Sequence, residues 1–141
     1  LAKIEKDIQS SEKLHQSEFC VVIESSLDIF SVFKGISSRE RAIDLFSEYR
    51  IWDTELNSGI LLYILLADRS FEIIADRGIS KLAKGNKFKE ISLEIEEKFK
   101  NQEFEKGVLL GINLLTTLLV KYYPIKKRSK KNEISNKPIL I

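Results

Sequence analysis

Apolar residues recur three or four positions apart over much of this chain, a spacing typical of helices that bury one face. The pattern predicts a first helix over residues 1–15 and a second that runs from Ser37 to Tyr49. Glu40 follows Ser37 at the capping-box spacing, which supports a helix start there. Three further helical pieces are predicted between residues 79 and 119. We expect each of these helices to pack one face on a core.

Short apolar runs rich in β-branched residues predict buried strands over residues 19–23, 60–66 and 71–75. The first two runs flank a predicted helix, and such βαβ units are almost always parallel and right-handed. Only four residues separate the last two runs, which predicts an antiparallel hairpin. The sequence therefore predicts an α/β fold with a small mixed sheet.

Composition narrows the protein class. The chain has 141 residues, 43% of them hydrophobic and 31% charged, which fits one globular domain. Its single cysteine, Cys20, cannot form an internal disulfide and is expected as a buried thiol in the first strand. The most apolar helix, over residues 108–120, would span about 20 Å, short of the roughly 30 Å of a bilayer core. No motif of a known catalytic type announces an enzyme.

Charge divides the chain into two parts. Residues 121–141 carry a net charge of +6, so residues 1–120 carry −4 of the total of +2. Pro124 should end the last helix, and we expect a domain over residues 1–124 followed by a basic C-terminal tail over residues 125–141. Such a tail either stays solvated or contacts an anionic membrane surface. Nucleic acid is not expected as a partner, and a protein partner stays open.

The predicted topology brings carboxylates from separate loops to one edge of the sheet. The expected group at this first edge is Glu18, Asp53, Glu55 and Asp76. Converging carboxylates repel one another and are retained most easily around a hard cation, so we predict a site for Ca²⁺ or Mg²⁺ there. The other interpretation is that these side chains cap turns or pair with nearby arginines. Glu24 and Asp28, at the opposite edge, form an alternative site, because ligands tend to bind beyond the carboxyl ends of parallel strands.

Several short stretches resemble the TPM domain family, also called the TPM phosphatase domain, and in particular its stand-alone bacterial members. The stretches are Arg39-Glu40-Arg41-Ala42, Trp52-Asp53-Thr54-Glu55-Leu56-Asn57-Ser58-Gly59-Ile60-Leu61, Ala67-Asp68-Arg69, Ala75-Asp76-Arg77-Gly78-Ile79 and the closing helix from Phe104 to Ile112. The similarity covers about residues 15–123. It implies a Rossmann-like three-layer α/β/α sandwich around the mixed sheet.

Because the sequence opens on Leu1, we expect an upstream segment. The localisation stays open between cytoplasmic and membrane-associated in a bacterium.

The resemblance implies two functions. The family includes a plant member described as an acid phosphatase, and some bacterial members are reported to bind divalent cations. The first hypothesis is a divalent-cation-binding accessory or scaffold module, and the alternative is a metal-assisted acid phosphatase acting on phosphomonoesters. Expected ligand or phosphate contacts are Arg69, Arg77, Asn57 and Asp68, of which all but Arg77 match recurring family positions. No catalytic residue can be named.

Overall fold

The computed structural model describes residues 1–83, 85–125 and 132–141, and it is built around a four-stranded mixed sheet in the order β3-β2-β1-β4. Strands β1 (Glu18–Glu24) and β2 (Gly59–Leu65) pair in parallel, with Glu18 opposite Gly59. Strand β3 (Ser70–Ala75) forms an antiparallel hairpin with β2. The three predicted strands and their directions are confirmed. A fourth strand, β4 (Ile139–Leu140), was not predicted and pairs in parallel with the other side of β1.

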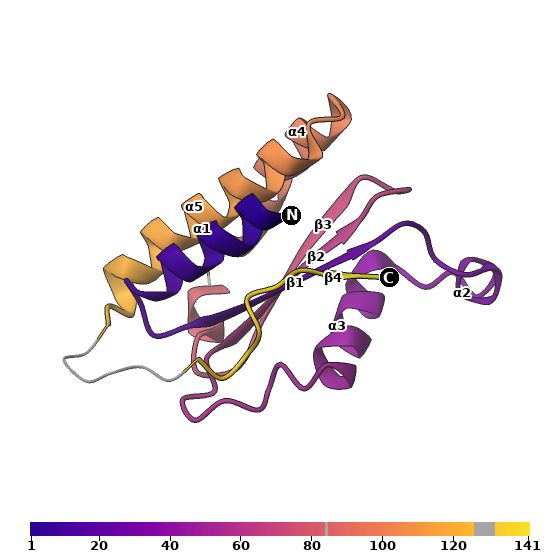
Figure 1. Cartoon of the computed structure of the whole chain (residues 1–141). Coiled ribbons are helices and arrows are strands. Elements are labelled where there is room, and N and C mark those ends of the chain that lie inside the picture. The colour runs from indigo at the N-terminus through magenta and orange to yellow at the C-terminus, as the bar shows by residue number, and fades with distance from the viewer. Residues whose placement is uncertain (84, 126–131) are drawn as a thin grey trace.

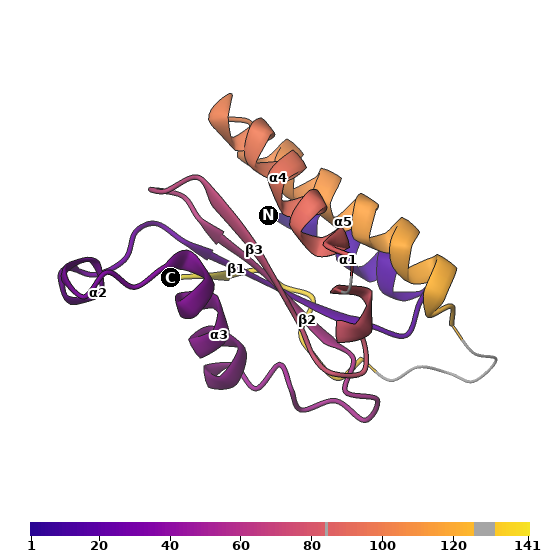
Figure 2. The same ribbon diagram turned by 180° about the vertical axis from the view of Figure 1, so that it is seen from behind.

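Helices cover both faces of this sheet (Figures 1 and 2). Helices α1 (Ala2–Glu12), α4 (Lys87–Lys100) and α5 (Phe104–Tyr122) form one layer, and α3 (Ser38–Glu48) forms the other. A short 3-10 helix, η1 (Ser80–Ala83), links β3 to α4. The expected three-layer α/β/α sandwich is therefore present. Helix α2 (Ile29–Phe33) belongs to neither layer and was not predicted.

The position of β2 at the centre of the fold explains why its sequence is apolar without interruption. All of its residues are buried, and alternate side chains enter two different cores. Ile60, Leu62 and Ile64 pack in the core under α1, α4 and α5. Leu61 and Tyr63 pack in the core under α3.

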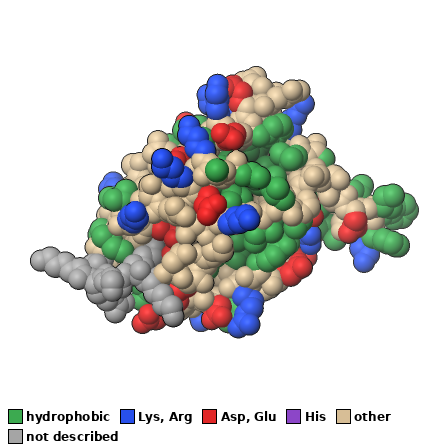
Figure 3. Space-filling view, viewed as in Figure 1, with side chains coloured by type: hydrophobic (Ala, Val, Ile, Leu, Met, Phe, Trp, Pro, Cys, Tyr) green, Lys and Arg blue, Asp and Glu red, His purple; other side chains and the backbone are tan. Residues whose placement is uncertain are grey.

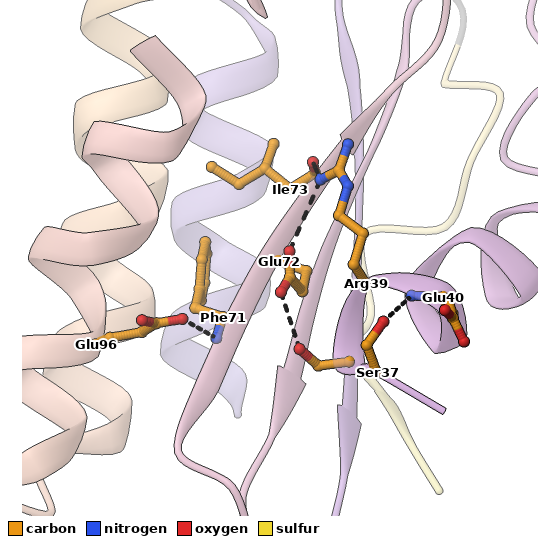
Figure 4. Close-up of polar contacts among 8 residues, drawn as sticks. Ser37, Arg39, Glu40, Phe71, Glu72, Ile73 and Glu96 are labelled. Atoms are coloured by element: carbon orange, nitrogen blue, oxygen red, sulfur yellow. Dashed lines mark hydrogen bonds and ion pairs between the residues drawn. The ribbon is translucent and has the colours of Figure 1, made fainter. Parts of the chain in front are cut away.

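The outer edge of β3 is closed by side chains from the helices beside it (Figure 4). Arg39 of α3 donates to the carbonyl oxygen of Ile73 at 2.9 Å and lies 3.7 Å from the Glu72 carboxylate. From α4, the Glu96 carboxylate accepts the backbone N–H of Phe71 at 3.2 Å. These contacts use backbone groups that an exposed edge strand would otherwise offer to another chain.

Two glycines allow the loop before β2 to pack against the sheet. A Cβ atom at Gly59 would overlap the carbonyl oxygen of Ile51, and one at Gly78 would overlap that of Asn57. The backbone N–H of Gly78 donates to the same Asn57 oxygen at 2.8 Å. Glycine at these positions therefore fixes the loop at the first edge of the sheet.

The end of the chain returns to the sheet. We call residues 132–141 the C-terminal strap; they run along β1, and the backbone N–H of Ile141 donates to Ile23 at 2.9 Å. The expected tail over residues 125–141 thus includes a segment that packs on the domain. Most of its basic residues lie at positions 126–131, outside the described residues. Within the described part of the chain, each helix is too short or too polar to cross a membrane.

Candidate functional site

Two carboxyl groups meet between the first helix and the first strand. Glu12 ends α1, and Glu18 begins β1. Glu12 is 7% exposed and Glu18 is completely buried. Their carboxyl groups lie within hydrogen-bonding reach of one another. A carboxylate oxygen of Glu12 also accepts the backbone N–H of Phe19 at 2.8 Å, which ties the helix end to the strand.

The C-terminal strap closes over this carboxyl pair. One oxygen of Glu18 accepts the backbone N–H groups of Glu133 and Ile134. Asn136 donates its side-chain amide to Glu12 at 3.0 Å. Each acid therefore contacts the other acid and also accepts hydrogen bonds from the strap.

The environment of Glu12 favours its protonated form. Burial, followed by the neighbouring Glu18, raises the pKa of Glu12 to about 8, although hydrogen bonds from Phe19 and Asn136 oppose the shift. A buried carboxyl group beside a second one avoids a double charge by keeping its proton. With its pKa near 8, Glu12 therefore stays largely protonated in neutral solution.

A cavity of about 460 Å³ opens beside the pair. Its lining is Gln9, Glu12, Lys13, Glu18, Ile125, Asn132 and Asn136. Carboxylate and amide oxygens are the ligands that Ca²⁺ and Mg²⁺ take from proteins. The carboxyl pair and the two asparagines thus form a donor set of the right chemistry for such a cation.

The structure distributes the predicted first-edge ligands differently from the expectation. Asp53 pairs with Arg50 at 3.1 Å on the surface, and Asp76 accepts the backbone N–H of Arg77 at 2.8 Å. Glu55 contributes its backbone N–H to the Glu133 carboxylate. Among the described residues, no group of three or more Asp, Glu, His or Cys side chains is placed to hold a metal ion. Of the four, Glu18 alone lines the cavity described above.

The alternative edge is occupied by structural contacts. The Glu24 carboxylate accepts hydrogen bonds from Arg41 at 3.0 and 2.9 Å and from the Tyr63 hydroxyl at 2.6 Å. Burial raises the pKa of Glu24, but these donors outweigh it and hold the pKa below its usual value. Asp28 caps α2 by accepting the backbone N–H of Ser31 at 2.7 Å. These two carboxylates therefore stabilise local structure.

The four expected phosphate contacts lie at opposite ends of β3. Asp68 and Arg69 are in the hairpin turn before the strand, whereas Arg77 follows it and Asn57 lies beside it. Six strand residues span roughly 20 Å, too far for both pairs to contact one phosphoryl group. Asn57 and Arg69 have positive φ angles of 51° and 52°, so both occupy tight turns.

A serine and the single histidine also form a buried pair. The Ser11 hydroxyl lies 2.9 Å from Nε2 of His15, and Nδ1 of His15 accepts the backbone N–H of Ser17 at 3.1 Å. Because Nδ1 is an acceptor, the ring proton is on Nε2 and points toward Ser11. Ser11 also contacts the Thr116 hydroxyl, which donates to Ile112. This series of hydrogen bonds joins α1 to α5. In this tautomer Nε2 of His15 already carries a proton, so His15 cannot take one from Ser11.

Comparison with known proteins agrees with this architecture. The family model described as TPM domain matches residues 1–118. This chain belongs to the TPM domain family. The solution structure of BA42 from the psychrophilic bacterium Bizionia argentinensis is similar, with 29% identity, coverage of 99% of this chain and 90% of BA42, and a TM-score of 0.82.

A more distant match shows the fold alone. The N-terminal domain of a P. gingivalis protein, a structural-genomics target, shares 18% identity over 84% of this chain and 72% of that one, with a TM-score of 0.68. The comparison with curated proteins gave no match.

Glu12 is not among the site residues expected from the sequence, although the sequence contains a signal that its side chain is buried. Ile4, Ile8 and Glu12 follow one another at four-residue spacing, so the carboxyl group occupies the buried face of the first helix. A charged residue at a core-facing position is unusual and needs a partner. Asn132 and Asn136 carried no comparable signal, because their position depends on how the strap returns to the sheet.

Proposed function

We propose that this TPM domain is a divalent-cation-binding accessory or scaffold module whose cation site is the cavity beside Glu12 and Glu18. The observation that carries the proposal is the contact between two almost fully buried carboxyl groups at the wall of a cavity. Asn132 and Asn136 line the same cavity, and the Asn132 amide donates to the Asn136 amide oxygen at 3.0 Å. A cation would take amide oxygens from these two side chains in place of that hydrogen bond.

The electrostatics of the pair support a cation. Burying two carboxyl groups against each other is unfavourable unless a proton or a cation compensates their charge. A bound Ca²⁺ or Mg²⁺ compensates both charges at once and takes oxygen ligands. The surface-exposed ion pair at Asp53 has no comparable need.

The contacts of the strap support a scaffold role. Glu12 and Glu18 hold the strap through Asn136 and the backbone of Glu133. A cation between these acids would therefore help to fix the position of the strap. The strap carries β4, the outer strand of the sheet beside β1. Binding of this kind orders a surface for a partner and requires no reaction.

The test is a titration of the whole chain with Ca²⁺ and with Mg²⁺, followed by backbone amide chemical shifts and calorimetry. We expect shifts at residues 12, 18 and 132–136 and a loss of affinity of at least about tenfold in Glu12→Gln and Glu18→Gln. Asp53→Asn and Asp76→Asn are the matched controls, since each makes the same acid-to-amide change away from the cavity, and they should bind normally.

Two outcomes would overturn this assignment. Loss of binding in Asp53→Asn and Asp76→Asn, but not in Glu12→Gln, would return the site to Glu18, Asp53, Glu55 and Asp76. The absence of any shift at millimolar cation would remove the cation from the proposed function.

The alternative function, a metal-assisted acid phosphatase, draws on one observation. Lys13 lines the same cavity as the carboxyl pair, so a cation and an ammonium group would face a phosphoryl oxygen together. This alternative predicts hydrolysis of p-nitrophenyl phosphate that needs Ca²⁺ or Mg²⁺ and falls in Glu12→Gln and Lys13→Gln. Cation binding without such hydrolysis would favour the accessory module.

A further inference from the structure

Helix α2 is apolar, exposed and formed without help from the core. Ile29, Phe30, Val32 and Phe33 are between 64% and 91% exposed, and no residue of the helix is buried. Figures 1 and 2 show the helix standing clear of both helical layers, and Figure 3 shows its apolar side chains on a projection at one side of the molecule. The helix and its flanking residues are independent of the cation site described above.

Local hydrogen bonds specify this helix. Asp28 caps its first turn, and the backbone N–H of Ile36 donates to Ser31 at 3.1 Å across Gly35, which has a φ of +68°. This arrangement is a Schellman-type helix end. Because caps rather than packing form α2, its apolar side chains do not serve the folding of the helix. At about 100° per residue they share an arc of roughly 160°, with Phe33 near the centre.

A groove with matching properties lies between α1 and α5. It has a volume of about 430 Å³. Four apolar residues line it together with four uncharged polar ones; the apolar residues are Leu14, Leu109, Leu110 and Ile112, and the polar ones are Ser10, Ser11, Asn113 and Thr116. Leu14 is itself 51% exposed. This space can take more than one large apolar side chain.

The charges beside the helix and the groove are complementary. Asp28 precedes α2 and Lys34 follows it, while Lys3 and Asp7 of α1 line the groove. A helix lying in the groove parallel to α1 would set each acid opposite a base. Like charges would meet in the reverse direction, so the pattern selects one orientation.

We propose that two copies of this chain form a closed dimer in which α2 of each copy docks in the α1–α5 groove of the other. The area required favours two reciprocal contacts. Phe30 and Phe33 would bury about 300–500 Å² at 150–250 Å² each, less than the roughly 800 Å² per partner of a standard interface. Two equivalent contacts related by a twofold axis reach that size and leave no free helix or groove for further growth.

The test is the mass of the full chain by light scattering after size exclusion, at concentrations up to the order of 100 µM. We expect a mass near twice 16.3 kDa for the wild type. Phe33→Asp removes the helix contact and Leu14→Asp the groove contact, and each should weaken dimerisation by roughly 30-fold or more. Leu93→Asp is the matched control, since Leu93 is 52% exposed on α4, and it should remain dimeric.

Mixing the two defective variants separates docking from misfolding. A mixed dimer of Phe33→Asp with Leu14→Asp keeps one intact helix and one intact groove that face each other. The mixture should therefore dimerise more strongly than either variant alone. A wild type that stays monomeric, a mixture that shows no recovery, or Phe33-dependent binding to phosphatidylcholine–phosphatidylglycerol vesicles by a monomeric chain would each overturn the proposal.

Discussion

At the scale of single residues, the buried acids Glu12 and Glu24 respond to their surroundings in opposite ways. Glu12 faces another carboxyl group, and burial and Glu18 raise its pKa to about 8. Glu24 faces Arg41 and Tyr63, whose hydrogen bonds outweigh burial and lower its pKa. The position of each acid thus decides whether its ionised form costs or contributes stability.

Glu12→Gln should remove most of a pH-dependent loss of stability that the wild type shows. In the unfolded chain this carboxyl group ionises near its ordinary value, about 4.3, whereas in the fold it keeps its proton up to about 8. The folded state therefore binds more protons between these values, and stability falls as the pH rises through this window. Urea unfolding with a chelator present should show that decline, on the order of a few kcal/mol, in the wild type and little of it in Glu12→Gln. An equal decline in both proteins would contradict this account.

Glu24→Gln should show the opposite pH dependence. The ionised Glu24 accepts three hydrogen bonds, two of them from Arg41. Its contribution is complete above the unfolded value of about 4.3 and is lost as the pH falls through the lower pKa of the folded state. We expect the substitution to cost about 1–3 kcal/mol at pH 7 and much less in acid. Glu97→Gln, on an exposed ion pair, is the control and should change stability by less than about 0.5 kcal/mol.

At the scale of elements, α2 should open and close without affecting the rest of the domain. None of its side chains is buried, and only local backbone hydrogen bonds and its two caps hold its single turn and a half. Phe33→Asp should therefore leave the free energy of unfolding of the monomer within about 0.5 kcal/mol of the wild type. Amide exchange, measured at a dilution that keeps the chain monomeric, should be fast in α2 and slow in β2. A large loss of stability in the variant would mean that Phe33 packs on the body of the domain.

The elements also show which parts of the fold sequence patterns can predict. The hairpin and the long helices followed from apolar runs and helical spacing. Ser37 caps α3 as expected, since its hydroxyl accepts the backbone N–H of Glu40 at 3.1 Å. Helix α2 is too short for a periodic signal and has no buried face. Strand β4 pairs through two residues that are more than a hundred positions from β1. A contact of that range and length leaves no local pattern.

The candidate site was predictable only in part for the same reason. Glu18 was identified because it begins a buried strand at the expected edge of the sheet. Its contacts with Glu12 and Glu133 depend on how α1 and the strap pack, which the topology of the central sheet alone does not determine. Two of the expected phosphate contacts, Arg69 and Asn57, have positive φ angles, which places both in tight turns.

At the scale of the whole molecule, the strap links parts of the chain that are distant in sequence. It pairs with β1, contacts Glu18 and Glu12, and reaches the loop before β2 through Glu133. Removing it would expose two buried carboxyl groups to water on one side and take away backbone donors from Glu18. A cation bound at the carboxyl pair would therefore change the position of β4 through the strap.

Deleting residues 132–141 should weaken both the fold and the proposed cation site. The deletion removes β4 and the hydrogen bonds from the strap to Glu12 and Glu18. Hydrogen bonds to charged groups contribute about 1.5–3 kcal/mol each, but water reaching the carboxylates offsets part of this, so we expect a net loss of about 2–4 kcal/mol in urea unfolding. Calcium affinity should fall by at least about tenfold, because Asn132 and Asn136 leave with the strap. Asn136→Ala separates these effects: it keeps β4, so it should lower calcium affinity more than stability, whereas Lys137→Ala should change neither. Full calcium affinity in the shortened chain would mean that the cation contacts the domain elsewhere.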